Sequence, residues 1–211
     1  MATFYIKEER MKKGLLNFLG SDSGFGFNNN SAYYIKNKRI IIFDCGMTVF
    51  NELRKKVNLK NFDNIDIIIT HLHPDHAGSL GQLIMYLWYK LNKKANIYTQ
   101  CLNIIKYLDI IGVDQKIYNL KDDKDIKFIK TEHVPELDSY GVVLNLEEKR
   151  IIYTGDTATL KPFYEEMNGA DELYVDVSKN GGVHIKIDDV VGKLKEFKLN
   201  RRKCFLDAHR R

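Results

Sequence analysis

Three histidines and one aspartate lie within six consecutive positions of this chain: His71, His73, Asp75 and His76. Imidazole and carboxylate groups are the preferred ligands of borderline divalent metals such as zinc. Alternate residues of an extended loop point the same way, so His71 and His73 can reach one metal position. Asp75 and His76, at the expected turn into a helix, can reach a second one. The spacing therefore indicates a loop that can serve two metal ions.

Further ligands must come from elsewhere in the chain, because one metal needs at least one more ligand and two metals need a bridging carboxylate. Three residues fit this requirement: His133, Asp156 and His209. Each follows the C-terminal end of an expected strand, as His71 does. Strand ends are places where sheets present site residues together, so this shared position favours a common metal centre.

Each of these residues taken singly also has an ordinary structural interpretation. His133 fits a loop histidine, and Asp156 fits a turn residue, since it follows a glycine. His209 lies two residues before the end of the sequence, where chains often fray. His184 fits a residue at the start of a helix.

The elements that must position these residues alternate apolar strands with amphipathic helices. β-branched and apolar runs predict strands over 15–19, 32–35, 39–44, 65–70, 96–99, 126–131, 140–146, 150–154, 173–177 and 203–206. Helical spacing predicts helices over 80–91 and 102–111, a short helix between Pro162 and Gly169, and a final helix capped by Asp188. The first three strands predict an antiparallel meander. Two strand-rich halves, each followed by helices, favour an α/β fold with a four-layer αββα sandwich.

Length and composition are those of an ordinary globular chain. At 211 residues, with 44% hydrophobic and 29% charged residues, the chain is expected to form a single domain over 1–211. The net charge of +5 agrees with an anionic partner. Three widely spaced cysteines in apolar runs predict buried thiols without disulfides. Neither a signal peptide nor a membrane span is expected, so we predict a cytoplasmic protein with no membrane partner.

The HxHxDH loop, followed by separate His, Asp and His residues, resembles the metallo-β-lactamase fold hydrolases. The similarity spans essentially the whole chain, from 18–20 through 42–46 to the last histidine. It implies the αββα fold and two divalent metal ions, with zinc expected and manganese or iron as alternatives. The implied ligand set gives one metal His71, His73 and His133, gives the other Asp75, His76 and His209, and makes Asp156 the bridge. Asp75 also counts among the implied catalytic residues.

A sixth histidine, His184, narrows the resemblance to ribonuclease Z-like phosphodiesterases. In that group a histidine at this place, after a strand that ends in glutamate, protonates the leaving oxygen. Here the expected strand 173–177 carries Asp176 instead, which shortens the reach. The resemblance implies that His184 is the general acid and that Asp176 orients its imidazole and raises its pKa.

Ribonuclease Z also carries an arm that grips tRNA, inserted between the ligands that correspond to His133 and Asp156. Those two residues are only 23 positions apart here, and two strands and a turn occupy the interval. The chain therefore resembles compact members of the group, including the phage and bacterial anti-Pycsar phosphodiesterases, which hydrolyse cyclic mononucleotides. This resemblance implies a small anionic phosphodiester substrate such as a cyclic nucleotide, no folded RNA, and a role in evading anti-phage defence.

Two other functions remain open on the residues alone. One is an acyl, lactone or thioester hydrolase of the same fold, for which His184 has no obvious assignment. The other is a non-catalytic protein that sequesters a nucleotide on a retained metal site. A complete set of metal ligands favours the enzyme over this binding protein.

Two further segments have alternative interpretations. The glycine-rich segment 20–26 lacks the lysine and the following helix of a P-loop, so it predicts a tight turn with room for a pocket-lining role. Tyr86, Trp88 and Tyr89 exceed what one apolar helix stripe needs. They favour either a homodimer surface, as the resemblance implies, or a second packing partner within the chain.

Overall fold

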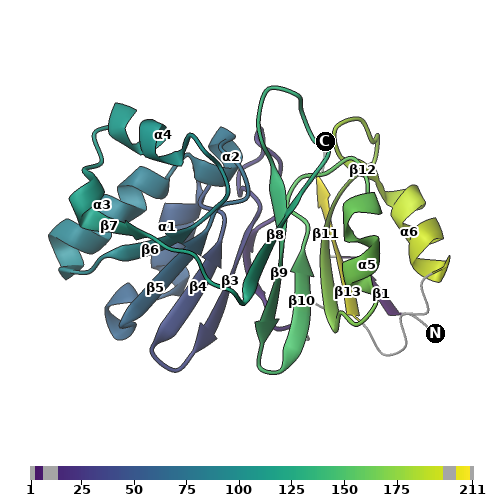
Figure 1. Ribbon diagram of the computed structural model, residues 1–211, viewed down its shortest axis with the longest axis horizontal. Helices are drawn as coiled ribbons and strands as arrows, with labels where there is room; N and C mark the ends of the chain where they lie inside the picture. The colour runs from purple at the N-terminus through teal and green to yellow at the C-terminus, as the bar shows by residue number, and fades with distance from the viewer. Residues whose placement is uncertain (1–2, 7–13, 197–202, 210–211) are drawn as a thin grey trace. The chain divides into compact units, whose positions relative to one another are not determined.

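The computed structural model describes residues 3–6, 14–196 and 203–209, which belong to two compact units (Figure 1). One unit spans residues 15–123, and the other joins residues 1–14 to 124–211. Each unit has its own sheet and its own apolar core. Because two sheets can belong to one domain, the single-domain organisation stays a prediction.

The unit 15–123 is built on a six-stranded sheet. Its strands, in sheet order, are β2 (Asn17–Gly20), β3 (Ser31–Lys36), β4 (Arg39–Phe43), β5 (Asn64–Ile68), β6 (Ala95–Tyr98) and β7 (Tyr118–Leu120). The first three are antiparallel, which confirms the predicted meander. The strands from β4 to β7 run parallel, so their carboxyl ends share one edge of the sheet.

Four helices accompany this sheet: α1 (Val49–Lys56), α2 (Pro74–Ala77), α3 (Leu80–Leu91) and α4 (Ile104–Ile110). Short 3₁₀ turns at η2 (Leu59–Asn61) and η3 (Gln115–Ile117) complete the unit. The structure confirms the predicted helix over 80–91, whose apolar stripe packs on Ile42 and Ile67 of the sheet within one core cluster. Helix α1 was not predicted, although its buried residues Val49, Phe50 and Leu53 follow helical spacing.

The second unit contains a seven-stranded sheet with the order β1-β13-β11-β10-β9-β8, and β12 pairs with β11. The strands are β1 (Thr3–Ile6), β8 (Ile126–Lys130), β9 (Tyr140–Leu146), β10 (Lys149–Tyr153), β11 (Glu172–Ser178), β12 (Ile185–Lys186) and β13 (Lys203–His209). Strands β10, β11 and β13 are parallel to one another, and β8 and β9 form antiparallel pairs beside them. Strand β8 therefore runs in the same direction as β10.

Helices in this unit are short. The 3₁₀ turn η4 (Lys161–Phe163) leads into α5 (Tyr164–Met167), where the sequence predicts a short helix, and α6 (Ile187–Glu196) follows β12. Phe163 and Met167 pack with strand residues in the apolar core of the unit. The prediction that Asp188 caps the last helix is wrong: β12 runs directly into α6, so the helix begins at Ile187 and Asp188 lies in its first turn. An acidic side chain there still favours the positive end of the helix dipole.

The three cysteines confirm the prediction from their spacing. Cys45, Cys101 and Cys204 are buried and form no disulfide. Burial raises the pKa of the Cys45 and Cys204 thiols to about 12, because a charged thiolate is disfavoured in an apolar interior. Within the described ranges, no helix combines the length and apolar character needed to cross a bilayer.

Candidate active site

The histidine loop of the unit 15–123 follows the carboxyl ends of two neighbouring parallel strands. Strands β4 and β5 are in register up to Phe43 and Ile68, so the residues after them leave the sheet at the same edge. The chain then passes through His71 and His73 into α2, which begins at Pro74. Proline suits a first helical position because its φ is preset and its missing N–H is not needed there.

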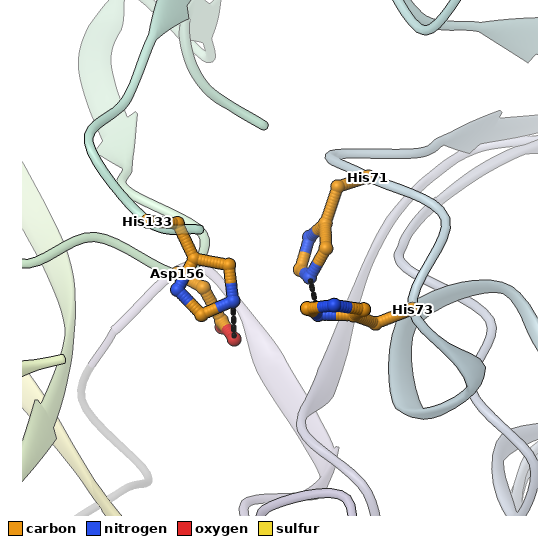
Figure 2. Close-up of side chains that lie close together, drawn as sticks. All are labelled: His71, His73, His133 and Asp156. Atoms are coloured by element: carbon orange, nitrogen blue, oxygen red, sulfur yellow. Dashed lines mark hydrogen bonds and ion pairs between the residues drawn. The ribbon is translucent and has the colours of Figure 1, made fainter. Parts of the chain in front are cut away.

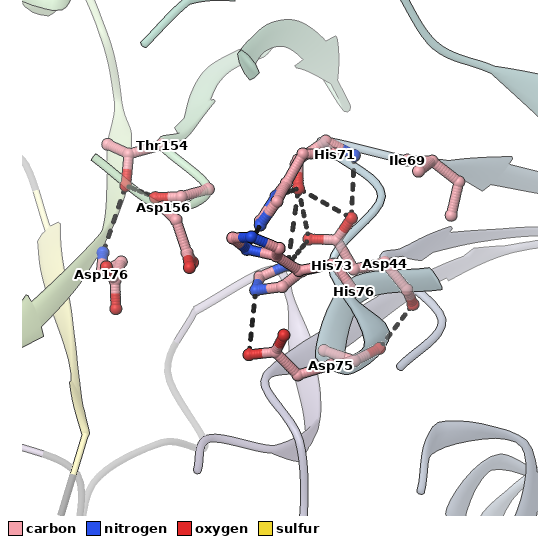
Figure 3. Close-up of polar contacts among 12 residues, drawn as sticks. Asp44, Ile69, His71, His73, Asp75, His76, Thr154, Asp156 and Asp176 are labelled. Carbon is pink, nitrogen blue, oxygen red and sulfur yellow. Dashed lines mark hydrogen bonds and ion pairs between the residues drawn. The ribbon is translucent and has the colours of Figure 1, made fainter. Parts of the chain in front are cut away.

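The ring nitrogens of His71 and His73 face one another in this loop. Nε2 of His71 lies 3.0 Å from Nδ1 of His73 (Figure 2). Asp75 and His76 lie in α2, where Oδ2 of Asp75 is 3.6 Å from Nε2 of His76 (Figure 3). His71 and His76 are fully buried, while His73 and Asp75 are partly exposed. The unit thus presents two pairs of donor atoms of the kind that metals bind.

Asp44, directly after β4, orients His76 by a direct contact and His71 through the hydroxyl of Thr70. Its carboxylate accepts hydrogen bonds from Thr70 N (2.8 Å) and Thr70 Oγ1 (2.9 Å), and His76 Nδ1 lies 2.9 Å from Oδ2. Because the Thr70 hydroxyl donates to Asp44, it can accept from Nδ1 of His71 at 3.1 Å. Both histidines then carry their proton on Nδ1, and the lone pair is on Nε2. Such outer contacts are what fix the tautomer of a metal-binding histidine.

Asp44 itself is fully buried, and its backbone has a φ of 61°. Burial raises the pKa of the Asp44 carboxyl, while His76 and the hydrogen bonds from Thr70 act in the opposite direction. Asp44 and Thr70 were not among the predicted site residues. The available signal was their position in the sequence, because Asp44 and Thr70 each follow a strand at the edge where the histidines lie.

The second unit presents a group of its own after β8, β10 and β11. His133 follows β8, and its Nδ1 donates to the carbonyl oxygen of Val183 at 3.0 Å. The remaining ring nitrogen, Nε2, lies 3.5 Å from Oδ2 of Asp156, which follows β10 (Figure 2). Thr131 Oγ1 donates to the backbone oxygen of Asp156 at 2.9 Å and so holds the turn in place. Both site side chains are almost completely buried.

His184 and Asp176 form a close pair beside Asp156. Nδ1 of His184 lies 2.6 Å from Oδ2 of Asp176 and 3.8 Å from Oδ2 of Asp156. Asp176, near the end of β11, is buried, and its backbone N–H donates to Thr154 Oγ1 at 3.1 Å (Figure 3). The imidazole is partly exposed, with 17% of the side chain accessible. Because Nδ1 lies against Asp176, the other ring nitrogen, Nε2, lies on the side of the ring away from that carboxylate.

The last predicted ligand is placed only by its backbone. His209 ends β13 and is in register with Ser178 at the carboxyl end of β11. Its side chain lies outside the described part of the chain.

The donor atoms of each unit fit divalent metal ions. Zinc–nitrogen distances of about 2.0–2.1 Å in a tetrahedral site separate neighbouring ligand atoms by about 3.3 Å. The pairs His71–His73, His133–Asp156 and Asp75–His76 have separations of 3.0, 3.5 and 3.6 Å. Asp156, Asp176 and His184 form a further group whose ligand atoms lie within 4.8 Å of one another. Imidazole and carboxylate donors at these spacings suit zinc, manganese or iron.

Residues 25–179 match the Metallo-beta-lactamase superfamily, and the chain belongs to this family. It is 28% identical over 168 residues to the anti-Pycsar protein Apyc1 of Paenibacillus sp. (strain J14), a match that covers 67% of this chain and 66% of the relative. It is 23% identical to the anti-Pycsar protein Apyc1 of Bacillus phage 010DV004, over 86% of this chain and 84% of that one. The match to the anti-Pycsar protein Apyc1 of Paenibacillus xerothermodurans covers 62% of this chain and 62% of that relative.

Solved structures share the fold. The metallo-beta-lactamase fold protein YhfI from Bacillus subtilis superposes with a TM-score of 0.69 at 16% identity, covering 90% of this chain and 95% of that one. Human tRNase Z, short form, gives a TM-score of 0.69 at 16% identity, covering 93% and 95%.

These comparisons confirm the predicted family resemblance and the predicted fold class, the metallo-β-lactamase fold with mixed helices and strands and two sheets. Together with the clusters of ligand atoms, family membership suggests a dinuclear site for divalent metal ions.

Proposed function

We propose that the protein is a metal-dependent hydrolase that cleaves small phosphodiesters, with cyclic nucleotides as the favoured substrates. The observation that carries this proposal is the pair of His184 and Asp176 beside Asp156, with separations of 2.6 and 3.8 Å. A partly exposed imidazole, oriented by a buried carboxylate next to a metal-binding carboxylate, is suited to protonate a leaving oxygen. The names of the anti-Pycsar relatives support the choice of substrate.

Seven residues are the proposed metal ligands: His71, His73, Asp75, His76, His133, Asp156 and His209. Their division between two metals stays a prediction from the family resemblance. We propose zinc as the metal, with manganese or iron as alternatives. When bound, such ions supply positive charge to the phosphoryl oxygens and lower the pKa of the attacking water.

The role of His184 follows from its two ring nitrogens. Cleavage of the P–O bond in a cyclic phosphate leaves negative charge on a ribose oxygen, which needs a proton. Nε2 of His184 gives that proton, while Asp176 holds Nδ1–H and stabilises the protonated ring before transfer. The deprotonated imidazole then takes a proton from solvent before the next turnover.

The chain between His133 and Asp156 supports a small substrate rather than a folded RNA. It consists of a loop and the antiparallel hairpin of β9 and β10, whose turn at Glu147 and Glu148 has positive φ values of 51° and 63°. This hairpin belongs to the sheet. It is therefore not the protruding arm that the resemblance associates with tRNA binding.

Replacing His184 tests the proposal directly. His184→Ala should lower the kcat for cyclic nucleotides about 10²- to 10⁴-fold, which is the usual contribution of a general acid. Metal analysis should still find about two ions per chain, as in the wild type. Asp176→Asn should lower kcat and shift the pH profile, and Asp176→Glu should restore part of the activity if the carboxylate acts by orienting the ring.

Several outcomes would overturn the proposal. Unchanged activity in His184→Ala would exclude the general acid. Loss of one metal from that variant would instead make His184 a ligand, as its place in the Asp156 group allows. The wild type should be screened on cyclic mono- and dinucleotides, linear phosphodiesters and a lactone. Hydrolysis of the lactone alone would identify an acyl hydrolase, and unaltered nucleotide after long incubation with metal-loaded protein would identify a binding protein.

A homodimer is also proposed, from the aromatic residues of α3. Tyr86 and Trp88 pack against the core cluster of their own unit, which accounts for much of their apolar surface, whereas Tyr89 is 70% exposed. Of the three, Tyr89 therefore has the most surface left to contact a second copy of the chain. Light scattering should give twice the mass of one chain.

A cytoplasmic location, in the host cytosol for a phage gene, and evasion of anti-phage defence remain predictions.

A further inference from the structure

We propose that Phe25 and Phe27 form an aromatic platform on which the base of the substrate nucleotide stacks. This inference rests on the proposed function, because it assigns the part of the protein that binds the base of a cyclic nucleotide. Both residues lie in the connection between β2 and β3 of the unit 15–123, the glycine-rich segment in which the sequence left room for a pocket-lining role.

The two rings are almost completely exposed. Phe25 has 96% and Phe27 has 92% of its surface accessible, more than any other large hydrophobic residue described as exposed. A phenylalanine gains nothing for folding when its ring is in water, because the hydrophobic contribution depends on buried apolar area. Two such rings, separated by one glycine, therefore point to a role in binding.

The loop that carries the rings is ordered by its own hydrogen bonds. Asp22 N–H and Ser21 N–H both donate to the carbonyl oxygen of Asn28, at 2.7 and 3.0 Å, and Asn28 N–H donates to Oδ2 of Asp22 at 2.9 Å. Asn29 and Thr48 exchange further hydrogen bonds, with Asn29 N–H donating to Thr48 Oγ1 at 2.8 Å and Thr48 N–H donating to Asn29 Oδ1 at 3.1 Å. A base that stacks on a loop held in this way does not have to order it first, which saves conformational entropy.

The same loop lies against Asp75, a proposed metal ligand. A methyl group placed on Gly24 would be 3.2 Å from Cγ and Oδ2 of Asp75. That separation is shorter than an ordinary van der Waals contact, so Gly24, the residue beside Phe25, has only the room of a glycine next to this carboxylate. A cyclic nucleotide is small enough that its phosphate and its base can both be bound within such a short stretch of surface.

The chemistry of the loop favours a base over a phosphate. Residues 20–30 contain no lysine, arginine or histidine, and the carboxylate of Asp22 adds negative charge. Such a loop cannot neutralise a phosphate, whereas aromatic faces bind bases by stacking. Stacking tolerates every base, since each has a π-face. We therefore expect this platform to raise affinity for all cyclic nucleotides with little preference among them.

The test compares substrates with and without a base. Phe25→Ala, Phe27→Ala and the double variant should raise the KM for cyclic AMP and cyclic UMP about 5- to 140-fold per ring that stacks. The kcat should change by less than about twofold. Ribose 3′,5′-cyclic phosphate has the same phosphodiester but no base, so its kcat/KM should be unaffected. Phe25→Tyr and Phe27→Tyr should keep the wild-type KM, because tyrosine retains the ring.

Ile110→Ala is the matched control, because Ile110 is an exposed apolar residue (74%) on α4 that has no assigned role. It should leave every kinetic constant unchanged. An unchanged KM for both cyclic nucleotides in the double variant would overturn the proposal. An equal loss on ribose cyclic phosphate, together with a change in mass by light scattering, would also overturn it and would assign the rings to an interface between copies.

Failure of the proposed function is recognised separately. If the wild type hydrolyses no phosphodiester, calorimetric titration with cyclic AMP still measures binding. A Kd raised by the alanine variants but not by the tyrosine variants would then support the platform in a binding protein. Equal Kd values in all variants would reject it.

Discussion

At the scale of single residues, the histidines of the loop 71–76 depend on a carboxylate that is not a proposed ligand. Asp44 contacts His76 directly and His71 through the hydroxyl of Thr70. These contacts hold both protons on Nδ1 and direct both Nε2 lone pairs away from Asp44. The metal-binding strength of the loop should therefore depend on the charge of Asp44 as well as on its size.

Asp44→Asn tests this dependence with little change in shape. Asparagine tolerates the left-handed backbone at φ 61° better than other residues with a side chain, so the fold around position 44 should survive. An amide has one oxygen acceptor in place of two and no negative charge. We expect the metal affinity to fall about 10- to 100-fold, measured by competition with a chromogenic chelator.

Asp66→Asn is the control for this substitution. Asp66 is also buried, and its partners are Arg39 and Asn96 rather than histidines. Its replacement should lower the free energy of unfolding but leave the metal affinity within about twofold of the wild type. If Asp44→Asn binds metal as tightly as the wild type, Asp44 has no role in orienting the loop.

At the scale of elements, close backbone contact fixes the short helix α2 against the turn after β4. A methyl group on Gly46 would overlap severely with the backbone oxygen of Asp75. Cys45 N–H donates to the carbonyl oxygen of His76 at 2.7 Å across the same contact. Only a glycine at position 46 lets the two segments approach in this way. The position of Asp75 and His76 is therefore set by the segment after β4.

Gly46→Ala should displace α2 and weaken both stability and metal binding. We expect a loss of at least about 2 kcal/mol in the free energy of unfolding, because backbone on both sides must move. Gly192→Ala is the matched comparison: it lies inside α6 with nothing within 4 Å of an added methyl group. It should raise stability by about 0.5–1 kcal/mol. Urea denaturation measures the free energy of unfolding of both variants. Equal effects in the two variants would contradict the contact at Gly46.

At the scale of the whole molecule, the chain leaves one unit and returns to it. Residues 1–14 belong with 124–211, and strand β1 pairs in parallel with β13 at the edge of that sheet. The unit 15–123 is therefore inserted between two parts of the other unit. If the inserted unit unfolded, a long flexible loop would lie between β1 and the rest of its own unit. Pairing β1 with β13 would then cost loop-closure entropy.

This connection predicts cooperative unfolding, as expected for a single domain. Differential scanning calorimetry should give one transition, with equal calorimetric and van't Hoff enthalpies. Two resolved transitions would show that the units are independent domains.

Much of the fold was predictable from the sequence because apolar periodicity reports burial locally. The helix over 80–91 and the strands around positions 40, 67 and 152 each bury side chains at the period that their structure requires. Among the elements that were missed, β1, β7 and β12 have four residues or fewer, which leaves little periodicity to recognise. Helix α1 was missed as well, although its buried residues Val49, Phe50 and Leu53 follow helical spacing. Asp188 was assigned as a cap because its residue type suits one, although the preceding strand made Ile187 the first helical residue.

The chemistry of the site was likewise determined by the sequence, since ligand types and their spacing in 71–76 follow from covalent connectivity alone. Tertiary structure decided which atoms are available for that chemistry. Asp44 is 32 positions from the histidine that it orients, and His184 approaches Asp156 only because β11 and β12 pair beside β10. Nor does the sequence distinguish Phe25 and Phe27 from core phenylalanines. Their exposure depends on how the backbone of the loop folds, and hydrogen bonds between distant residues determine that fold.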